Sequence, residues 1–288
     1  MNPLQFHQWL YRIIDTPQLL NLRKTILNKK QNGYHIQAWW RDDDVIDDTE
    51  ELKKLISFSC LNKIPVNLAV VPQKLSNEGV ILIKQYTHLS VIQHGYSHTN
   101  YANVGDPLNE FGLLRSLEIQ LKEIRIGFEK LITAFGNQFV PVFVPPWGHI
   151  AESVIEQVST IGIKGISLIG DHDKMYPNLI NNNVHVDIHS WKTESDTSYE
   201  VKIRAYNQII DDVNNKIKKE KSDDDCLTIG ILTHSQIMDN NDWHIFGKLV
   251  KAIKKMGIEF IGIEKILHGL LIFMIFLLNE NIRIHNIL

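Results

Sequence analysis

Runs of apolar, often β-branched residues recur along the chain, and segments with helical spacing separate most of them. Short, nearly continuous apolar runs are typical of strands that are buried on both faces of a parallel sheet. The predicted strands are HIQAWWR (35–41), PVNLAVV (65–71), LSVIQH (89–94), PVFVP (141–145), IKGISLI (163–169), NVHVDIH (183–189), LTIGILTH (227–234) and IEFIGI (258–263).

The intervening segments carry apolar residues three and four apart, which predicts amphipathic helices. The predicted helices lie in 47–63, 109–136, 151–162, 197–219 and 241–257. Strand and helix alternate about eight times, which favours a (β/α)7-8 TIM-like barrel over an open sheet. We expect an N-terminal helical extension at 1–34, one α/β barrel domain at 35–265 and an apolar tail at 266–288.

Composition limits the partners and the compartment that are expected for the protein. The chain has 288 residues, 44% of them hydrophobic and 22% charged, with a formal net charge of −3. No long basic stripe is present, so nucleic acid is not an expected partner. Two cysteines without CxxC spacing fit a reduced compartment. The N-terminus has no signal-peptide pattern, and we therefore predict a cytoplasmic protein.

The apolar tail contains ten consecutive apolar residues, GLLIFMIFLL (269–278). A membrane-spanning helix needs about 20 such residues. We therefore interpret 266–278 as a final buried helix or strand. Attachment to a membrane surface, or contact with a partner, is the alternative.

Polar residues gather where the predicted strands end. Asp42, Asp43 and Asp44 follow the first strand, and His94 ends the third. VPPWGH (144–149) ends the fourth, while Asp187 and His234 lie at the ends of two later strands. In a parallel barrel these strand ends meet on one face, where active sites are built.

The HGYSH segment suggests a metal site. His94 and His98 are four residues apart, so on a helical turn both imidazoles would face the same way. Two imidazoles and a carboxylate from another segment suit a divalent transition metal, foremost Zn²⁺. An HxxxH pair alone is a weak signal, because such histidines are often surface or packing residues.

The triple aspartate and His234 each have two interpretations. One carboxylate can bind a metal while the next acts as general base on water, or the run is an acidic turn before a helix. The second interpretation fits Asp47 and Asp48, which precede Thr49. His234 is either a satisfied core residue or a general acid that protonates a leaving amine.

Taken together, these motifs resemble a known family. Asp-Asp, HxxxH, Pro-Pro-aromatic-Gly, Asp…Trp and Leu-x-His occur in the order of the polysaccharide deacetylases with the NodB homology domain, carbohydrate esterase family 4, over about residues 36 to 263. The resemblance implies a distorted (β/α) barrel and a metal-dependent hydrolase that removes N-acetyl groups from an amino sugar in a polysaccharide or glycan intermediate.

Site residues follow from aligning the motifs. RDDDV (41–45) implies Asp43 as catalytic base and Asp44 as metal ligand, and HGYSH implies His94 and His98 as the other ligands. The roles implied for the remaining residues are a groove wall from Pro146 and Trp147, an acid from His234 oriented by Asp187, and an acetyl pocket lined by Trp191. We also expect Tyr96 to bind substrate, and a backbone N–H near Tyr96 to Asn100 to assist the oxyanion.

The sequence also departs from the family pattern. The arginine that contacts the base in the family's third motif is Val144 here. We hypothesise that Arg41, beside the aspartates, supplies the guanidinium instead. Val45 replaces the glycine after the Asp pair, and Gly95 replaces the Ser or Thr after the first histidine.

Two rival functions remain open at this stage. One is a carbohydrate-binding barrel without catalysis, to which Val144 gives weight. The other is hydrolysis of a different small amide or formamide, because a fold does not fix a substrate.

Overall fold

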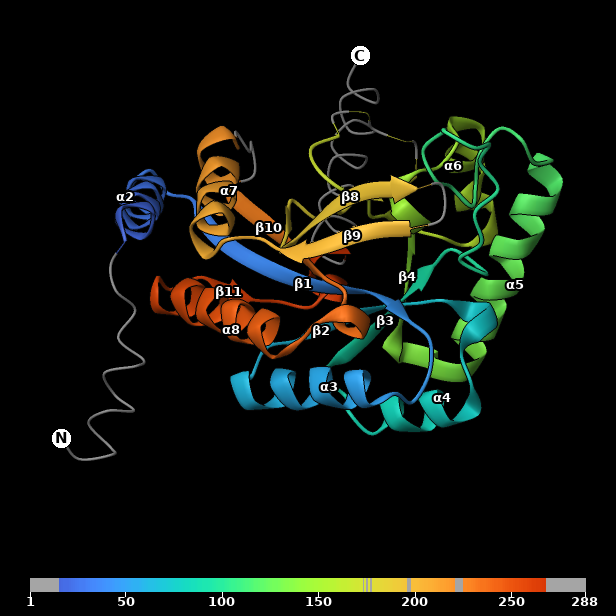
Figure 1. The fold of residues 1–288 in the computed structure, drawn as a ribbon, viewed down its shortest axis with the longest axis horizontal. Helices are drawn as coiled ribbons and strands as arrows, with labels where there is room; N and C mark the ends of the chain where they lie inside the picture. The colour runs from blue at the N-terminus through green and yellow to red at the C-terminus, as the bar shows by residue number, and fades with distance from the viewer. Residues whose placement is uncertain are drawn as a thin grey trace, which may run out of the picture.

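A computed structural model describes residues 16–267 apart from 173, 175, 177, 196–197 and 221–224. Its centre is a curled parallel sheet whose strands follow the order β6-β5-β4-β3-β2-β1-β10-β7, with β11 paired to β1 (Figure 1). The strands are β1 (His35–Val45), β2 (Val66–Val70), β3 (Leu89–His94), β4 (Phe139–Val144), β5 (Gly165–Ile166), β6 (Ile180–Asn181), β7 (Val186–Asp187), β10 (Cys226–Thr233) and β11 (Glu259–Phe260).

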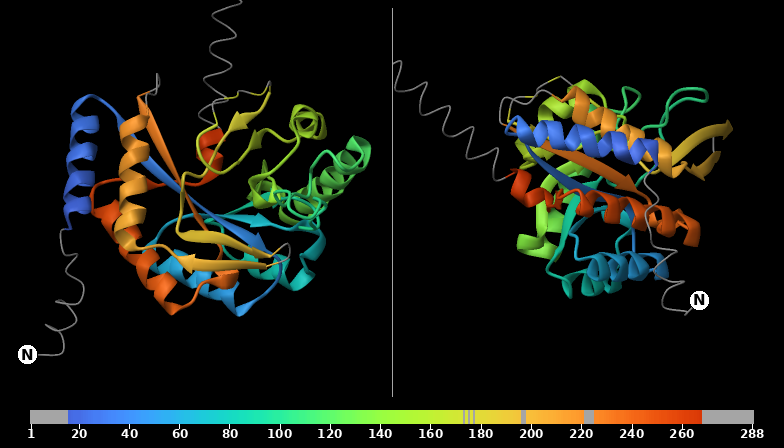
Figure 2. Two further views of the ribbon diagram at one scale, coloured as in Figure 1. Left: turned by 45° about the horizontal axis from the view of Figure 1, so that its top comes forward. Right: turned by 90° about the vertical axis from the view of Figure 1, so that its left-hand side faces the viewer.

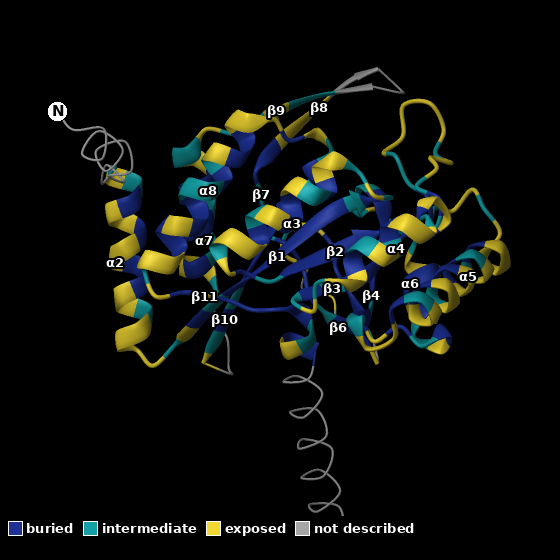
Figure 3. Cartoon of the chain, turned by 90° about the horizontal axis from the view of Figure 1, so that it is seen from below, coloured by how far each residue is buried: buried dark blue, intermediate teal, exposed yellow. Residues whose placement is uncertain are grey.

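Helices cover the outside of the sheet, and their exposed sides face away from the strands (Figure 3). They are α2 (Pro17–Gln31), α3 (Glu50–Asn62), α4 (Asn77–Lys84), α5 (Leu117–Phe135), α6 (Glu152–Val158), α7 (Tyr206–Lys219) and α8 (Asn240–Lys255). The Thr49 side chain caps α3 by accepting a hydrogen bond from the Leu52 amide. The cap is thus Thr49 itself, and the preceding Asp48 pairs with Lys53.

Alternation along β1 sorts its side chains onto two faces of the sheet. Trp40 packs in the large cluster between the sheet and the helices. Trp39 packs in a second cluster with residues of β2, β3, β4 and β10, on the concave face. Arg41 and Asp43 follow Trp39 at two-residue spacing, so the same alternation turns them toward the concave side.

One segment links the two ends of the sheet. The Asn182 amide donates to the carbonyl of Ile166, at the end of β5, and the Val184 amide donates to that of Leu168, just after β5. The His185 and Ile188 amides donate to β10, at Gly230 and Leu232. The sheet therefore curls into a distorted barrel, and the predicted fold class is confirmed.

Two predicted helices need correction. The segment 197–219 is not one helix: β9 (Ser198–Ile203) pairs antiparallel with β8 (His189–Ser195), and only α7 is helical. The hairpin β8–β9 stands apart from the main sheet (Figure 2). Helix α5 begins at Leu117 rather than at 109, because 109–116 forms a loop that contributes to the site.

The two ends of the chain are described only in part. Helix α2 packs beside α7, as Figures 1 and 2 show. Ile266 and Leu267 are buried in the concave cluster, whereas 1–15 and the run 268–288 lie outside the described residues. Within the described ranges, no helix combines the length and apolar character needed to cross a membrane. The domain boundaries at 34/35 and 265/266 stay predictions.

Candidate metal centre and active site

The three consecutive aspartates have three separate sets of partners. Asp42 is fully buried and accepts hydrogen bonds from the Thr233 hydroxyl (2.5 Å), the Ser235 amide (2.9 Å) and the Ser235 hydroxyl (2.6 Å). Burial raises the pKa of Asp42 to about 8, against these hydrogen bonds, and the charge of Asp43 adds to the increase. Asp42 thereby fixes the end of β10, on both sides of His234.

Asp43 is held by Arg41 through two parallel contacts. The Arg41 Nε lies 2.8 Å from one carboxylate oxygen of Asp43, and Nη2 donates to the other at 2.9 Å. The remaining Nη1 donates to the Ser167 hydroxyl (2.6 Å) and carbonyl (3.1 Å). Both charged side chains are almost completely buried. This bidentate geometry fixes the carboxylate in one orientation.

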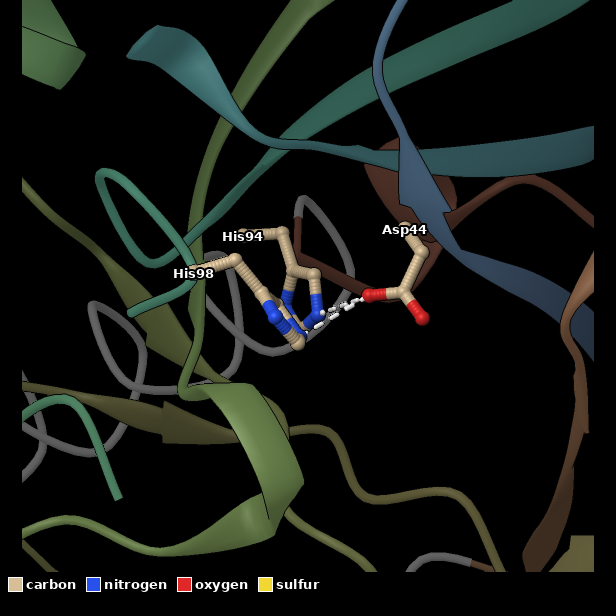
Figure 4. A group of neighbouring side chains, drawn as sticks. All are labelled: Asp44, His94 and His98. Atoms are coloured by element: carbon tan, nitrogen blue, oxygen red, sulfur yellow. Dashed lines mark hydrogen bonds and ion pairs between the residues drawn. The ribbon is translucent and has the colours of Figure 1, made fainter. Parts of the chain in front are cut away.

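Asp44 turns away from its neighbours toward two histidines. Its φ of 64° lies in the left-handed region, and the pairing of β1 with β2 shifts register between Asp42 and Val45. One Asp44 oxygen lies 3.2 Å from His94 Nε2 and 3.0 Å from His98 Nε2. Figure 4 shows both rings directed at this oxygen.

Charge is concentrated at this cluster. Burial works against ionisation of Asp44, but its hydrogen bonds to His94 and His98 outweigh burial and hold the Asp44 pKa well below its usual value. Burial likewise opposes protonation of His94, yet the charges of Asp43 and Asp44 raise the His94 pKa.

These three residues fit a divalent metal. Ligand atoms bound at about 2.0–2.2 Å from one ion are about 3 Å apart at right angles and about 3.4 Å apart in a tetrahedron. The Asp44 oxygen lies 3.2 and 3.0 Å from the two imidazole nitrogens, which is close to this range. The His94 Nδ1 lies 3.0 Å from the Val144 carbonyl. An N–H at that position leaves the Nε2 lone pair for a metal, as in most histidine metal ligands.

The loop between the histidines is held by Glu110, a residue that the sequence interpretation missed. The Glu110 side chain is fully buried and accepts hydrogen bonds from the amides of Tyr96 (3.2 Å), Ser97 (2.7 Å) and His98 (3.2 Å). The loop is not a helical turn, because Gly95 and His98 both have positive φ. The three amides are committed to Glu110, so they are not available to an oxyanion.

Gly95 is needed because the loop passes close to its neighbours. Its φ is +55°, and a Cβ there would lie 2.2 Å from a Glu110 carboxylate oxygen and 2.6 Å from the Pro146 ring. Pro146 is thus buried against this loop. Tyr96 packs against the apolar cluster that contains Phe111.

Trp147 extends the site beyond the metal cluster. It too has a positive φ, of 56°, and its ring centroid is 4.3 Å from that of His98. The aromatic face therefore borders the ligand cluster, which suits the predicted groove wall.

His234 lies beside Trp191, with 4.6 Å between ring centroids. Asp187 accepts hydrogen bonds from the Trp191 indole N–H (2.8 Å) and the His189 amide (2.9 Å). The His234 Nδ1 is buried without a hydrogen-bond partner. Asp187 therefore positions Trp191 directly, and a direct bond from Asp187 that orients His234 remains a prediction.

One cavity of about 890 Å³ joins these groups. Its lining includes Asp43, Asp44, His94, His98, Trp147, Asp187, Trp191 and His234. They come from the carboxyl ends of β1, β3, β4, β7 and β10 or from the segments just after them. Residues predicted from distant parts of the sequence thus meet at one site.

Comparison with known proteins places the fold. No family model and no curated protein matches the sequence. Solved structures do match. A proposed polysaccharide deacetylase from Mycobacterium smegmatis has a TM-score of 0.56 at 13% identity, covering 82% of this chain and 90% of that one. A family 4 acetyl xylan esterase from Clostridium thermocellum, in complex with cobalt, has a TM-score of 0.51 at 13% identity, with coverage of 82% and 91%.

A carbohydrate esterase family 4 esterase from Streptococcus mutans has a TM-score of 0.52 at 11% identity, covering 82% of this chain and 89% of that one. The chain has the fold of these structures. The motifs predicted a NodB-type barrel through their resemblance to this family. That prediction is therefore confirmed at the level of the fold.

Proposed function

We propose that the protein is a metal-dependent hydrolase that removes an N-acetyl group from an amino sugar in a polysaccharide or glycan intermediate. One observation carries this proposal. A single cavity contains a cluster of potential metal ligands, a buried carboxylate fixed by an arginine, and a histidine next to an indole ring. The acetyl-sugar activities named for structures of the same fold support it.

Asp44, His94 and His98 would hold the metal, with Zn²⁺ first among the transition metals that suit two imidazoles and one carboxylate. A bound divalent ion acts as a Lewis acid that polarises a carbonyl oxygen and lowers the pKa of water. Glu110 maintains the loop that carries His98, and the Val144 carbonyl orients the His94 ring.

Asp43 is the proposed general base. Its carboxylate lines the cavity, and both of its oxygens contact the Arg41 guanidinium. Arg41 holds the Asp43 carboxylate in one place, from which it would accept a proton from the attacking water. Arg41 thereby takes the place of the arginine that is missing at Val144.

His234 is the proposed acid for the leaving amine. Its ring lies against Trp191, whose indole is tied to Asp187. Trp191 and Trp147 present aromatic surface to the cavity, and such surface suits the acetyl methyl group and the apolar face of a sugar ring.

Metal content and acetate release test the proposal together. Purified protein should bind one Zn²⁺ per chain tightly and release acetate from N-acetylglucosamine oligomers. The double variant His94→Ala/His98→Ala should lose both properties. The matched control is His88→Ala, whose imidazole lies beside Cys60 and away from the cavity, and this variant should keep both.

The isosteric variant Asp43→Asn separates binding from chemistry. It should keep the metal while acetate release falls by at least about 100-fold, the lower range for loss of a general base. Metal-loaded wild-type protein that released no acetate from any N-acetylated glycan would contradict this substrate class. It would point instead to a binding barrel or to another small amide or formamide.

A further inference from the structure

A second cluster of potential metal ligands lies across the cavity from the first. Asp187, His189 and His234 each offer a ligand atom, and these atoms all lie within 4.8 Å of one another. Asp187 ends β7, His189 begins β8, and His234 directly follows β10. Pairing between β10 and β7 brings Leu232 opposite Asp187 and so sets this arrangement.

His189 has the features of a metal ligand that is held in advance. Its side chain is 3% exposed, and its Nε2 lies 3.3 Å from an Asp242 carboxylate oxygen. An N–H on Nε2 satisfies Asp242 and leaves a lone pair on Nδ1. That Nδ1 is buried and has no hydrogen-bond partner. A carboxylate behind an imidazole is the arrangement that commonly fixes the tautomer of a histidine bound to zinc.

The other members of the cluster complete the ligand set. The His234 Nδ1 is also buried without a hydrogen-bond partner. A buried acceptor that lacks a hydrogen-bond donor costs free energy. A bound cation removes this cost because it interacts with the lone pair of the acceptor, which another acceptor cannot do. Two imidazole nitrogens and one carboxylate oxygen match a borderline metal such as Zn²⁺.

His189 also borders a second cavity. A separate cavity of about 520 Å³ is lined by His189, Asp239 and Asp242, among others. Lys202 lines this cavity as well. His189 thus lies between this cavity and the residues that line the larger one.

We propose that Asp187, His189 and His234 form a second divalent metal site, distinct from the Asp44 cluster. Its regulatory consequence rests on the proposed function: an ion bound to His234 removes the group that protonates the leaving amine. Excess Zn²⁺ then inhibits the enzyme at a site other than the one that activates it. The second ion binds more weakly, because Asp187 already accepts two hydrogen bonds.

Zinc binding measured by equilibrium dialysis tests the site without relying on activity. The wild-type chain should bind one ion tightly and a second at higher Zn²⁺ concentration, and His189→Gln should bind only the first. The variant Asp242→Asn keeps all three ligands and should weaken the second ion by about 10- to 100-fold. The matched control His185→Gln changes a histidine whose Nε2 lies near Asp171 instead, and it should bind both ions.

Circular dichroism of each variant establishes that it is folded before zinc is added. A wild-type chain that saturates at one ion, or a folded His189→Gln variant that still binds two, overturns the proposal. Acetate release measured at low and high Zn²⁺ then separates the two proposals. Two ions without any acetate release would support the second site and contradict the deacetylase, whereas acetate release with one ion would do the reverse.

Discussion

Arg41 and Asp43 form a buried, bidentate ion pair two residues apart on one strand, with contacts of 2.8 and 2.9 Å. Neighbouring side chains on a strand face opposite ways, so i and i+2 is the shortest spacing at which a strand can place such a pair on one face. The Arg41 guanidinium therefore lies at the Asp43 carboxylate, as hypothesised from the sequence.

Replacing Arg41 should show how much this ion pair contributes to the free energy of unfolding. Arg41→Leu leaves the Asp43 carboxylate buried and unpaired, and removal of one partner of a buried pair typically costs about 3–5 kcal/mol. We expect a loss of that size in the free energy of unfolding, measured in urea. A loss no larger than that of Lys53→Ala, which removes an exposed partner of Asp48, would contradict the buried-pair account.

Glu110 should control metal affinity without touching the metal. Glu110→Gln keeps the shape of the side chain but weakens the hydrogen bonds that hold the amides of Ser97 and His98. Outer groups of this kind affect metal affinity by about 10- to 100-fold. Competition with a chelator measures the effect. The control is Glu118→Gln in the first turn of α5, and equal affinities for the two variants would exclude a positioning role for Glu110.

Alanine substitutions at two glycines with positive φ should distinguish the stability lost to backbone strain from the stability lost to steric overlap. Gly33→Ala meets no atom within 4 Å, so it should lose only the about 1–2 kcal/mol that a left-handed φ costs. Gly95→Ala also meets Glu110 and Pro146, and we expect a further loss of about 1–3 kcal/mol. Thermal unfolding of both variants measures the difference. Equal losses would mean that the 95–98 loop can move aside.

Stability should fall as the solution is acidified, through His185. Burial and the nearby charge of Lys216 lower the His185 pKa to about 4. The unfolded chain takes up this proton near pH 6.5 and the folded chain only near pH 4, so the contribution is complete above pH 6.5 and is lost as pH falls toward 4. The shift corresponds to about 3 kcal/mol.

Urea unfolding between pH 7 and pH 4 should therefore show a steeper loss for the wild-type chain than for His185→Gln. The difference between the two chains, rather than the wild-type slope, carries the test, since carboxylates titrate in both. Parallel slopes would show that His185 takes up a proton equally in the folded and unfolded chains.

Most of the parallel strands were predictable because they are short apolar runs buried on both faces, whereas β6 (Ile180–Asn181) lies outside every predicted run. The hairpin β8–β9 was not predictable, because SYEVKI alternates for only a few residues before helical spacing begins in the same segment. The start of α5 was placed too early for a similar reason. NEFGLLRS contains apolar residues at helical spacing, but Glu110 and Phe111 are used by the loop and the core instead.

Within the site, the sequence predicted which residue types meet but not which outer groups hold them. Asp44, His94 and His98 were predictable as a set, because a motif carries them. Glu110 and His189 were not, since their partners lie 12–14 and 53 residues away and neither occurs in a recognisable spacing. Tyr96 was predicted as a substrate-binding residue, which stays a prediction, and its amide donates to Glu110.

The end of β1 distributes three adjacent carboxylates among three different sets of contacts. Asp42 binds the Ser235 amide, Asp43 binds Arg41, and Asp44 faces two histidines. Position along the strand therefore decides which contacts each of the three carboxylates makes. Inserting or deleting one residue here would exchange all three roles at once, even though every carboxylate would still be present.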